Sequence, residues 1–133
     1  MDYDHPVSFG IFPSPRLDFS QEALQMARVA DEAGFDLVGI QDHPYQRRFL
    51  DTWALMAFVL AQTSRITVFP DVANLPLRPP RMMAKHGATL DQLSGGRFEL
   101  GLGAGAFWEG IEAMGGRKLS PKQSVDHLEL AIG

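Results

Sequence analysis

The chain has 133 residues, of which 45% are hydrophobic and 21% are charged, and its formal net charge is −4. These values are typical of one soluble globular domain and exclude a disordered chain. The negative charge offers no general attraction to nucleic acid or an anionic membrane, so we expect neither as a partner. Cysteine is absent, which excludes disulfides, thiolate metal sites and cysteine nucleophiles. With no signal segment and no apolar run of membrane-spanning length, a cytoplasmic location is expected.

The chain alternates short apolar runs with stretches of helical periodicity. In chain order, the pattern predicts a strand at residues 7–12, a helix at 21–33, a strand at 37–40, a helix at 51–64, a strand at 66–72, a helix at 79–93, a strand at 98–103 and a helix from 121 to the C-terminus. Ser20 and Ser120 are typical N-caps, and Gly34 is typical of a helix end. Pro79 and Pro80 fit the first turn of a helix, where a missing N–H costs little.

This order of elements, βαβαβαβα, predicts an α/β fold. Strands that alternate with helices through short connections form a parallel sheet with right-handed crossovers. The chain has no fixed-period repeat, low-complexity tract or linker, so we expect residues 1–133 to form one continuous unit. Two parallel folds are compatible with this order, a dinucleotide-binding Rossmann domain and a TIM (β/α)8 barrel.

Residues 101–106 match Gly-x-Gly-x-x-Ala, a loose version of the dinucleotide fingerprint. In a Rossmann domain the fingerprint lies in the first βα turn, and a helix begins inside it. Here it follows the fourth expected strand, and the next expected helix begins only after Ser120. This position argues against a phosphate-binding turn. It favours a fold of the TIM-barrel type in which the first four βα units are present, that is, a half-barrel.

Alternation along the strands places glycines and polar groups on the inward face of such a barrel. Gly39, Gly101 and Gly103 would face inward and leave room for a flat ligand. Polar residues also gather at the C-terminal ends of the strands, where barrel enzymes carry their sites. They are Asp42, His43, Asp71 and Asn74.

Two stretches, ARVADEAGFDLVGIQDHP and TSRITVFPDVANLPLRPPRMMAKHGATLDQLSGGRFELGLGAGAFW, closely resemble the luciferase-like monooxygenase superfamily. The resemblance covers nearly the whole chain, and its most specific marker is LSGGRFELGLGAG after a long helix. It implies a TIM barrel and a flavin- or deazaflavin-dependent oxidoreductase that uses FMN or coenzyme F420. The DHPYQ and NLPLRPP variants are most similar to the branch that uses F420.

The resemblance also implies roles for individual residues. Asp42 and His43 match positions against the cofactor ring, where the histidine can shuttle a proton or stabilise charge as hydride moves. His43 is therefore the expected catalytic residue. Asp71 and Val72 match the place where several members have a cis peptide bond that backs the ring. The expected cofactor contacts are Asp42, Asp71, Val72, Asn74, Gly103 and Gly105.

One position departs from the pattern of the family. Some deazaflavin dehydrogenases carry a catalytic glutamate just after the glycine loop, where this chain has Ala106, and Glu109 follows a few residues later. This departure argues against a sugar-phosphate dehydrogenase activity. The choice between oxygenase and dehydrogenase stays open.

Three functions remain compatible with these residues. The leading one is an oxidoreductase that moves hydride between a bound FMN or F420 and a small organic substrate. The alternative is a truncated, catalytically inert half-barrel that self-associates without a cofactor. A metal-dependent hydrolase is weakly supported, because the four histidines show no His-x-His or His-Glu-x-x-His spacing, and no metal site is expected.

Four βα units are half of a TIM barrel, which has eight units and about 250 residues. We therefore expect residues 1–133 to be the N-terminal half of a luciferase-like barrel domain. Such a half has open sheet edges, which tend to recruit another strand. A homo-oligomer formed through these edges is the expected assembly.

Overall fold

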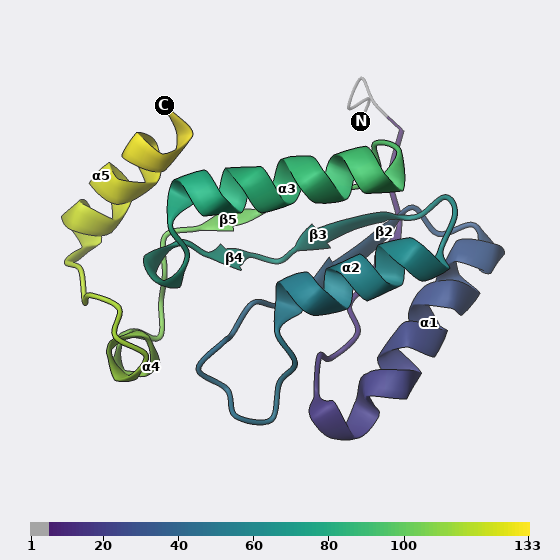
Figure 1. Ribbon diagram of the computed structural model, residues 1–133, viewed down its shortest axis with the longest axis horizontal. Coiled ribbons are helices and arrows are strands. Elements are labelled where there is room, and N and C mark those ends of the chain that lie inside the picture. Colours follow the sequence, from purple (N-terminus) through teal and green to yellow (C-terminus); the bar gives the residue numbers. More distant parts are fainter. Residues whose placement is uncertain (1–5) are drawn as a thin grey trace.

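The computed structural model describes residues 6–133 and contains one α/β unit (Figure 1). Its elements are β1 (Gly10–Ile11), α1 (Ser20–Ala33), β2 (Leu37–Ile40), α2 (Thr52–Gln62), β3 (Thr67–Pro70), β4 (Ala73–Asn74), α3 (Pro80–Ser94), β5 (Leu102–Gly103), α4 (Trp108–Ala113) and α5 (Pro121–Ile132). Short 3-10 turns precede α1 and follow β4, at Leu17–Phe19 and Leu75–Leu77. The expected alternation of strands and helices is confirmed.

All strand pairs are parallel, as predicted. β1, β2 and β3 form one sheet in chain order, and β4 pairs with β5 in a second, two-stranded sheet. The two sheets are joined at Val68, whose N–H donates to the Arg97 carbonyl (2.9 Å) and whose carbonyl accepts from the Glu99 N–H (3.1 Å). The segment before β5 therefore lies beside β3, so that the strands follow one another across the fold.

β2 has the predicted bounds, whereas the other predicted strands are shorter than the sequence indicates. β1 pairs only at Gly10 and Ile11, because an edge strand has a single neighbour to pair with. The strand expected at residues 66–72 ends at Pro70, and β4 begins after a cis peptide bond between Asp71 and Val72. This bond lies where the resemblance places one.

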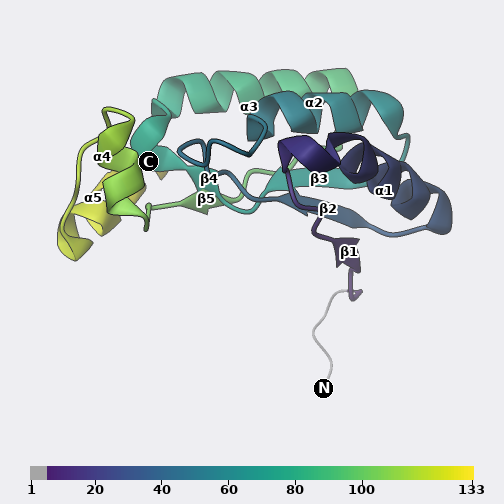
Figure 2. The same cartoon turned by 90° about the horizontal axis from the view of Figure 1, so that it is seen from below.

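The helices α1, α2 and α3 cover one face of the three-stranded sheet. Val38, Ile40 and Val68 point into this core and are fully buried. Figure 2 shows α2 and α3 above the strands, whereas no described helix lies below β2 and β3. Gly39 faces this uncovered side, since a Cβ added there would lie 3.0 Å from the ring of Phe69 and 3.1 Å from the ring of Phe12. The predicted inward direction of Gly39 is confirmed.

The helix ends follow the sequence signals except at the start of α1, and one short helix, α4, was not expected. Gly34 ends α1 in the left-handed conformation (φ 86°), and Ser120 caps α5 in a capping box with Gln123, both as expected. Ser20, however, is the first residue of α1, whose N-cap is Phe19 without a side-chain bond, because the 3-10 turn already leads the chain into the helix. α4 forms within a stretch that was expected to be a loop.

Asp31 joins the end of α1 to the start of β3. Its buried carboxylate accepts hydrogen bonds from the backbone N–H groups of Ser64 (2.8 Å), Arg65 (2.9 Å) and Ile66 (2.7 Å), and from the Ser64 hydroxyl (3.2 Å). Burial by itself would raise the pKa of Asp31, but these hydrogen bonds outweigh it and hold the pKa below its usual value. One charged side chain thereby satisfies three backbone N–H groups of the turn that leads into β3.

We expect Asp31→Asn to lower the free energy of unfolding at pH 7 by about 2–4 kcal/mol, because the amide cannot accept all of these bonds. A lowered folded-state pKa stabilises the wild type above the ordinary aspartate pKa of about 3.9, and this stabilisation is lost as the pH falls through the folded value. Asp31→Asn should therefore show a flatter stability profile below pH of about 4. Denaturant unfolding at several pH values measures both effects, with the exposed Glu32→Gln as control. Equal stability of Asp31→Asn and the wild type would contradict this role.

Candidate active site

A cavity of about 260 Å³ opens at the C-terminal ends of the strands. It brings together all seven residues that the sequence singled out for the site. These are Asp42, His43, Asp71, Val72, Asn74, Gly103 and Gly105. Tyr45 and Phe107 also line it, although the sequence analysis did not select them. Parallel strands explain this convergence, because their carboxyl ends meet at one edge of the fold.

His43 lies in a small aromatic cluster at the mouth of the cavity. Its Nδ1 is 2.5 Å from the hydroxyl oxygen of Tyr45. The His43 ring centroid lies 5.4 Å from both the Tyr45 ring and the Phe107 ring. Burial raises the pKa of the Tyr45 hydroxyl above its usual value, and the negative charge of Asp42 raises it further. The ring of His43 is therefore held by one hydrogen bond and by aromatic packing.

Asp42 lines the cavity, but its carboxylate is bound by the protein itself. The side chain is 1% exposed and forms a bidentate pair with Arg78, whose Nε and Nη2 donate to the two carboxylate oxygens at 2.9 Å each. The N–H of Asn74 donates to the same carboxylate at 3.0 Å. Asp42 thus joins the end of β2 to β4. Its direct contact with a cofactor stays a prediction.

Arg78 was not selected from the sequence, and it connects three elements. Besides Asp42, its Nη2 donates to Asp51 at 2.8 Å, and Asp51 also accepts the Ala54 N–H as the N-cap of α2. Burial by itself would lower the pKa of Arg78, but its hydrogen bonds to the two carboxylates raise it overall. Burial would likewise raise the pKa of Asp51, but the hydrogen bonds from Arg78 and Ala54 hold it below its usual value. The only sequence signal was an arginine within the NLPLRPP stretch.

Asn74 presents an unused acceptor at the cavity. The residue is 7% exposed, and its Oδ1 has no hydrogen-bond partner among residues 6–133. Buried polar atoms are nearly always paired, so this oxygen, which belongs to a residue of the cavity wall and is itself closed to solvent, is an exception among residues 6–133. An N–H or O–H donor of a bound molecule would satisfy it.

The glycines near β5 provide clearance for the protein chain rather than for a ligand. A Cβ added at Gly101 would lie 2.3 Å from the Pro70 carbonyl oxygen, and one added at Gly103 would lie 2.3 Å from Cγ2 of Val72. Gly105 has a φ of 98°, which disfavours other residues. The expectation that inward glycines leave room for a flat ligand is therefore wrong for Gly101 and Gly103. They allow β5 to lie against residues 70–72.

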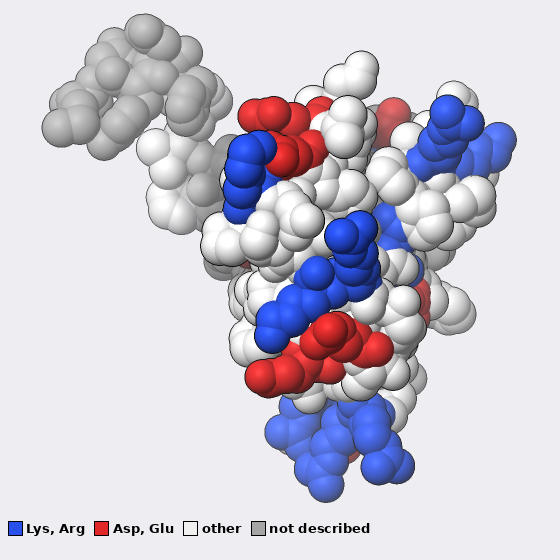
Figure 3. All heavy atoms as spheres, turned by 90° about the vertical axis from the view of Figure 1, so that its left-hand side faces the viewer, with Lys and Arg blue, Asp and Glu red and all other residues white. Residues whose placement is uncertain are grey.

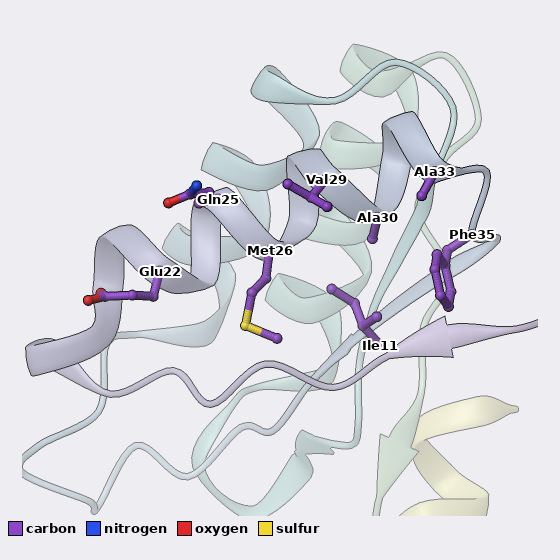
Figure 4. A pocket seen from close by; sticks show the side chains of 8 residues that line it. All are labelled: Ile11, Glu22, Gln25, Met26, Val29, Ala30, Ala33 and Phe35. Carbon is purple, nitrogen blue, oxygen red and sulfur yellow. The ribbon is translucent and has the colours of Figure 1, made fainter.

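A second, larger hollow of about 510 Å³ lies between β1 and α1. Figure 4 shows that Ile11, Met26 and Phe35 line it, while Glu22 and Gln25 lie toward the N-terminal half of α1. It lies on the helical side of an edge strand and has no group of converging polar side chains. The cavity at the strand ends is therefore the better candidate, although it is smaller.

Charged side chains of both signs surround the end of the molecule on which α4 and α5 lie. Figure 3 shows Lys and Arg in several separate groups there, with Asp and Glu between them. Arg47, Arg48, Arg117 and Lys118 are exposed in the segments that continue from His43 and Phe107. Both signs of charge are thus present at this end of the molecule, without a uniformly basic surface.

The profile of a family described as luciferase-like monooxygenase matches residues 8–129. The chain belongs to the luciferase-like monooxygenase family. It is 35% identical over 99 residues to 5,10-methylenetetrahydromethanopterin reductase of Methanopyrus kandleri, an alignment that covers 74% of this chain and 27% of that protein. It is 29% identical over 118 residues to 4-hydroxyprotoasukamycin monooxygenase of Streptomyces nodosus subsp. asukaensis, covering 82% of this chain and 32% of that protein. The family expected from the sequence is thereby confirmed.

Solved structures agree with this membership. The F420-dependent tetrahydromethanopterin reductase of M. kandleri has a TM-score of 0.76 and 26% identity over 94% of this chain and 39% of that chain. An F420-dependent secondary alcohol dehydrogenase, in complex with an F420–acetone adduct, has a TM-score of 0.80 and 25% identity over 96% of this chain and 41% of that chain. The oxygenating constituent of 3,6-diketocamphane monooxygenase from Pseudomonas putida, in complex with FMN, has a TM-score of 0.82 at 24% identity, over 96% of this chain and 38% of that chain. This last similarity shows the fold alone.

The chain spans about a third of the length of the curated relatives it matches, 27% and 32% for the two proteins above. Its α/β fold is that of luciferase-like proteins, and the half-barrel stays a prediction.

Ala106 stands at the position where the resemblance places a glutamate in some deazaflavin dehydrogenases, and it lines the cavity. Glu109 is exposed on α4 and does not line the cavity.

Two further features of the described residues concern the requirements of a membrane-spanning helix and of a metal site. No helix within residues 6–133 has the length and apolar character needed to cross a bilayer. In the same part of the chain, no three His, Asp or Glu side chains are close enough together to hold a metal ion.

We expect Arg78→Met to lower the free energy of unfolding by about 3–5 kcal/mol, because it leaves the buried Asp42 carboxylate without its counter-charge. Equilibrium unfolding in denaturant measures this change, and Arg81→Met, at an exposed arginine of α3, is the matched control. Adding Asp42→Asn to Arg78→Met should cost less than the sum of the two single substitutions, since the unpaired charge is then gone. A loss below about 1 kcal/mol in Arg78→Met, typical of surface ion pairs, would contradict this account.

Proposed function

We propose that this chain forms part of the cofactor site of an oxidoreductase that moves hydride between a bound FMN or F420 and a small organic substrate. The unpaired Asn74 oxygen in a cavity that also contains His43 carries this proposal. Family membership and the names of the relatives support the cofactor class. Two of the solved structures above are at least 25% identical to this chain, the reductase and the secondary alcohol dehydrogenase. Both are named as F420-dependent, which favours F420 over FMN.

The residues of the cavity fit such a cofactor in chemical type. Flavin and deazaflavin rings carry an N–H that the Asn74 oxygen could accept, and Val72 and Phe107 provide apolar surface for a ring. The bound cofactor would supply the hydride chemistry, and the protein would supply binding, orientation and electrostatics. His43 would hold a proton at its ring nitrogen next to the reacting atoms.

The size of the cavity limits what this chain does by itself. About 260 Å³ is below the range of roughly 300–1,000 Å³ that is usual for ligand pockets. The described residues would therefore form one wall of the site. The cytoplasmic location and the absence of a nucleic-acid partner stay predictions. The identity of the substrate and the choice between oxygenase and dehydrogenase stay open.

A second candidate is the inert half-barrel that self-associates without a cofactor. The uncovered face of the sheet supports it, because Phe12 is 54% exposed there and packs beside Gly39 and Phe69. An apolar sheet face in water is unstable unless another surface covers it. A second copy of the chain, meeting it face to face and edge to edge, would provide that surface.

Separate titrations of FMN and F420 into the protein, followed by absorbance and fluorescence, test the cofactor proposal. We expect one of the two to bind weakly, because the described residues would form only one wall of the site, and we expect Asn74→Leu to weaken that binding at least tenfold, the equivalent of about 1.4 kcal/mol for a lost hydrogen bond. Gln25→Ala, in the hollow between β1 and α1, should leave the affinity unchanged. Absence of binding by both cofactors would reject the proposal. Loss of binding in Gln25→Ala alone would place the cofactor in the other hollow.

Sedimentation velocity tests the second candidate. We expect the chain to form dimers or larger species at micromolar concentration, and we expect Phe12→Asp to shift it to monomer by placing a charge on the uncovered face. Phe58→Asp, at a phenylalanine of α2 that is 60% exposed, is the matched control and should not change the assembly. A monomeric wild type over the whole concentration range would contradict self-association.

A further inference from the structure

We propose that Tyr45 is a positioning residue for His43, whose neutral ring it holds in the tautomer that carries the proton on Nε2. The hydroxyl of Tyr45 donates to Nδ1, which leaves Nε2–H as the group that His43 can offer to a ligand. The consequence for catalysis rests on the proposed function. The tautomer itself does not.

The hydrogen bond between the two side chains has two possible directions. The Tyr45 hydroxyl can donate to an unprotonated Nδ1, or a protonated Nδ1 can donate to the hydroxyl oxygen. His43 is the only hydrogen-bond partner of this hydroxyl among residues 6–133. In the second direction the hydroxyl hydrogen has no acceptor among the described residues. The first direction gives it one and leaves Nε2–H of His43 as the unpaired donor.

The state of the Tyr45 hydroxyl supports the same direction. Burial and the nearby Asp42 carboxylate raise the pKa of Tyr45, so the hydroxyl keeps its proton at neutral and mildly alkaline pH. It therefore has a hydrogen to donate wherever the imidazole is neutral. A hydrogen bond to one ring nitrogen is a common way to select the histidine tautomer.

The ring of Tyr45 is held by α4, an element that follows the glycine-rich stretch. A Cβ added at Gly110 would lie 2.7 Å from Cγ of Tyr45, so the tyrosine ring lies directly against the helix at a residue without a side chain. Phe107, at the start of α4, packs on both rings, 5.9 Å from Tyr45 and 5.4 Å from His43. α4 thereby sets the place of the hydroxyl and, through it, the orientation of His43.

The occupied Nδ1 has a chemical consequence. Nε2 is the remaining nitrogen of His43, and in the neutral ring it is a donor. His43 would then donate a hydrogen bond to an oxygen or nitrogen of the ligand on which negative charge develops. A general base would need an unprotonated nitrogen facing the ligand, so the geometry assigns His43 the donor role.

Nitrogen-15 NMR of the histidine rings reads the tautomer directly, in the protein without a cofactor. At pH of about 8, above the ordinary imidazole pKa of about 6.5, we expect the long-range proton–nitrogen pattern of His43 to show a proton on Nε2. Tyr45→Phe should increase the fraction with the proton on Nδ1. Gly110→Ala, which displaces the Tyr45 ring but keeps its hydroxyl, should change the pattern in the same direction. Tyr3→Phe, at the only other tyrosine, is the control and should leave it unchanged.

The outcomes separate this inference from the proposed function. A wild-type His43 protonated on Nδ1, or an identical pattern in Tyr45→Phe, would overturn the positioning role even if FMN or F420 binds. A changed tautomer in a protein that binds neither cofactor would confirm the positioning role and reject the proposed function. If Gly110→Ala fails to fold, Tyr45→Phe decides, because it removes one oxygen and keeps the ring.

Discussion

The candidate site depends on the ion pair between Asp42 and Arg78. A buried carboxylate is costly unless its geometry is good and its oxygens are bonded, and here two guanidinium nitrogens and the Asn74 N–H meet that requirement. Through Arg78 the same pair reaches Asp51, which caps α2. The end of β2, the start of β4 and the first turn of α2 are therefore held together by one network of charges.

The shape of the cavity follows from this network and from the close approach of β5. With the ends of β2 and β4 joined, the segments that carry His43, Val72 and Asn74 converge at one place. Gly101 and Gly103 then allow the last strand to lie against residues 70–72, where a larger side chain would collide. Among the residues that line this cavity, Asn74 has a buried side-chain oxygen that no described residue satisfies. A wall of this kind, apolar with one or two placed polar groups, is typical of ligand sites.

Family membership and geometry contribute different parts of the functional argument. The family limits the chemistry to that of luciferase-like proteins, whose relatives above include reductases and monooxygenases. The geometry shows which polar atoms of the cavity residues already have a hydrogen-bond partner within the described residues. The carboxylate of Asp42 is occupied, Nδ1 of His43 is occupied, and the Asn74 oxygen is free. Because the cavity is small, the described residues would, under the proposed function, form one side of a cofactor site rather than a whole active site.

The sequence by itself determined the order of the main elements, the parallel α/β fold and seven of the residues that line the cavity. Hydrophobic periodicity is local, and in a parallel sheet the polar residues that follow each strand must gather at one edge, so Asp42, His43, Asp71 and Asn74 could be predicted. The tertiary structure decided which atoms these residues use. Asp42 and Arg78 are 36 residues apart, and Gly103 meets Val72 only across the strands. α4 was missed because it is a six-residue helix, too short for a periodic signal, and yet it places the tyrosine that binds His43. Contacts between distant segments leave no trace in local pattern, and so only the folded chain shows them.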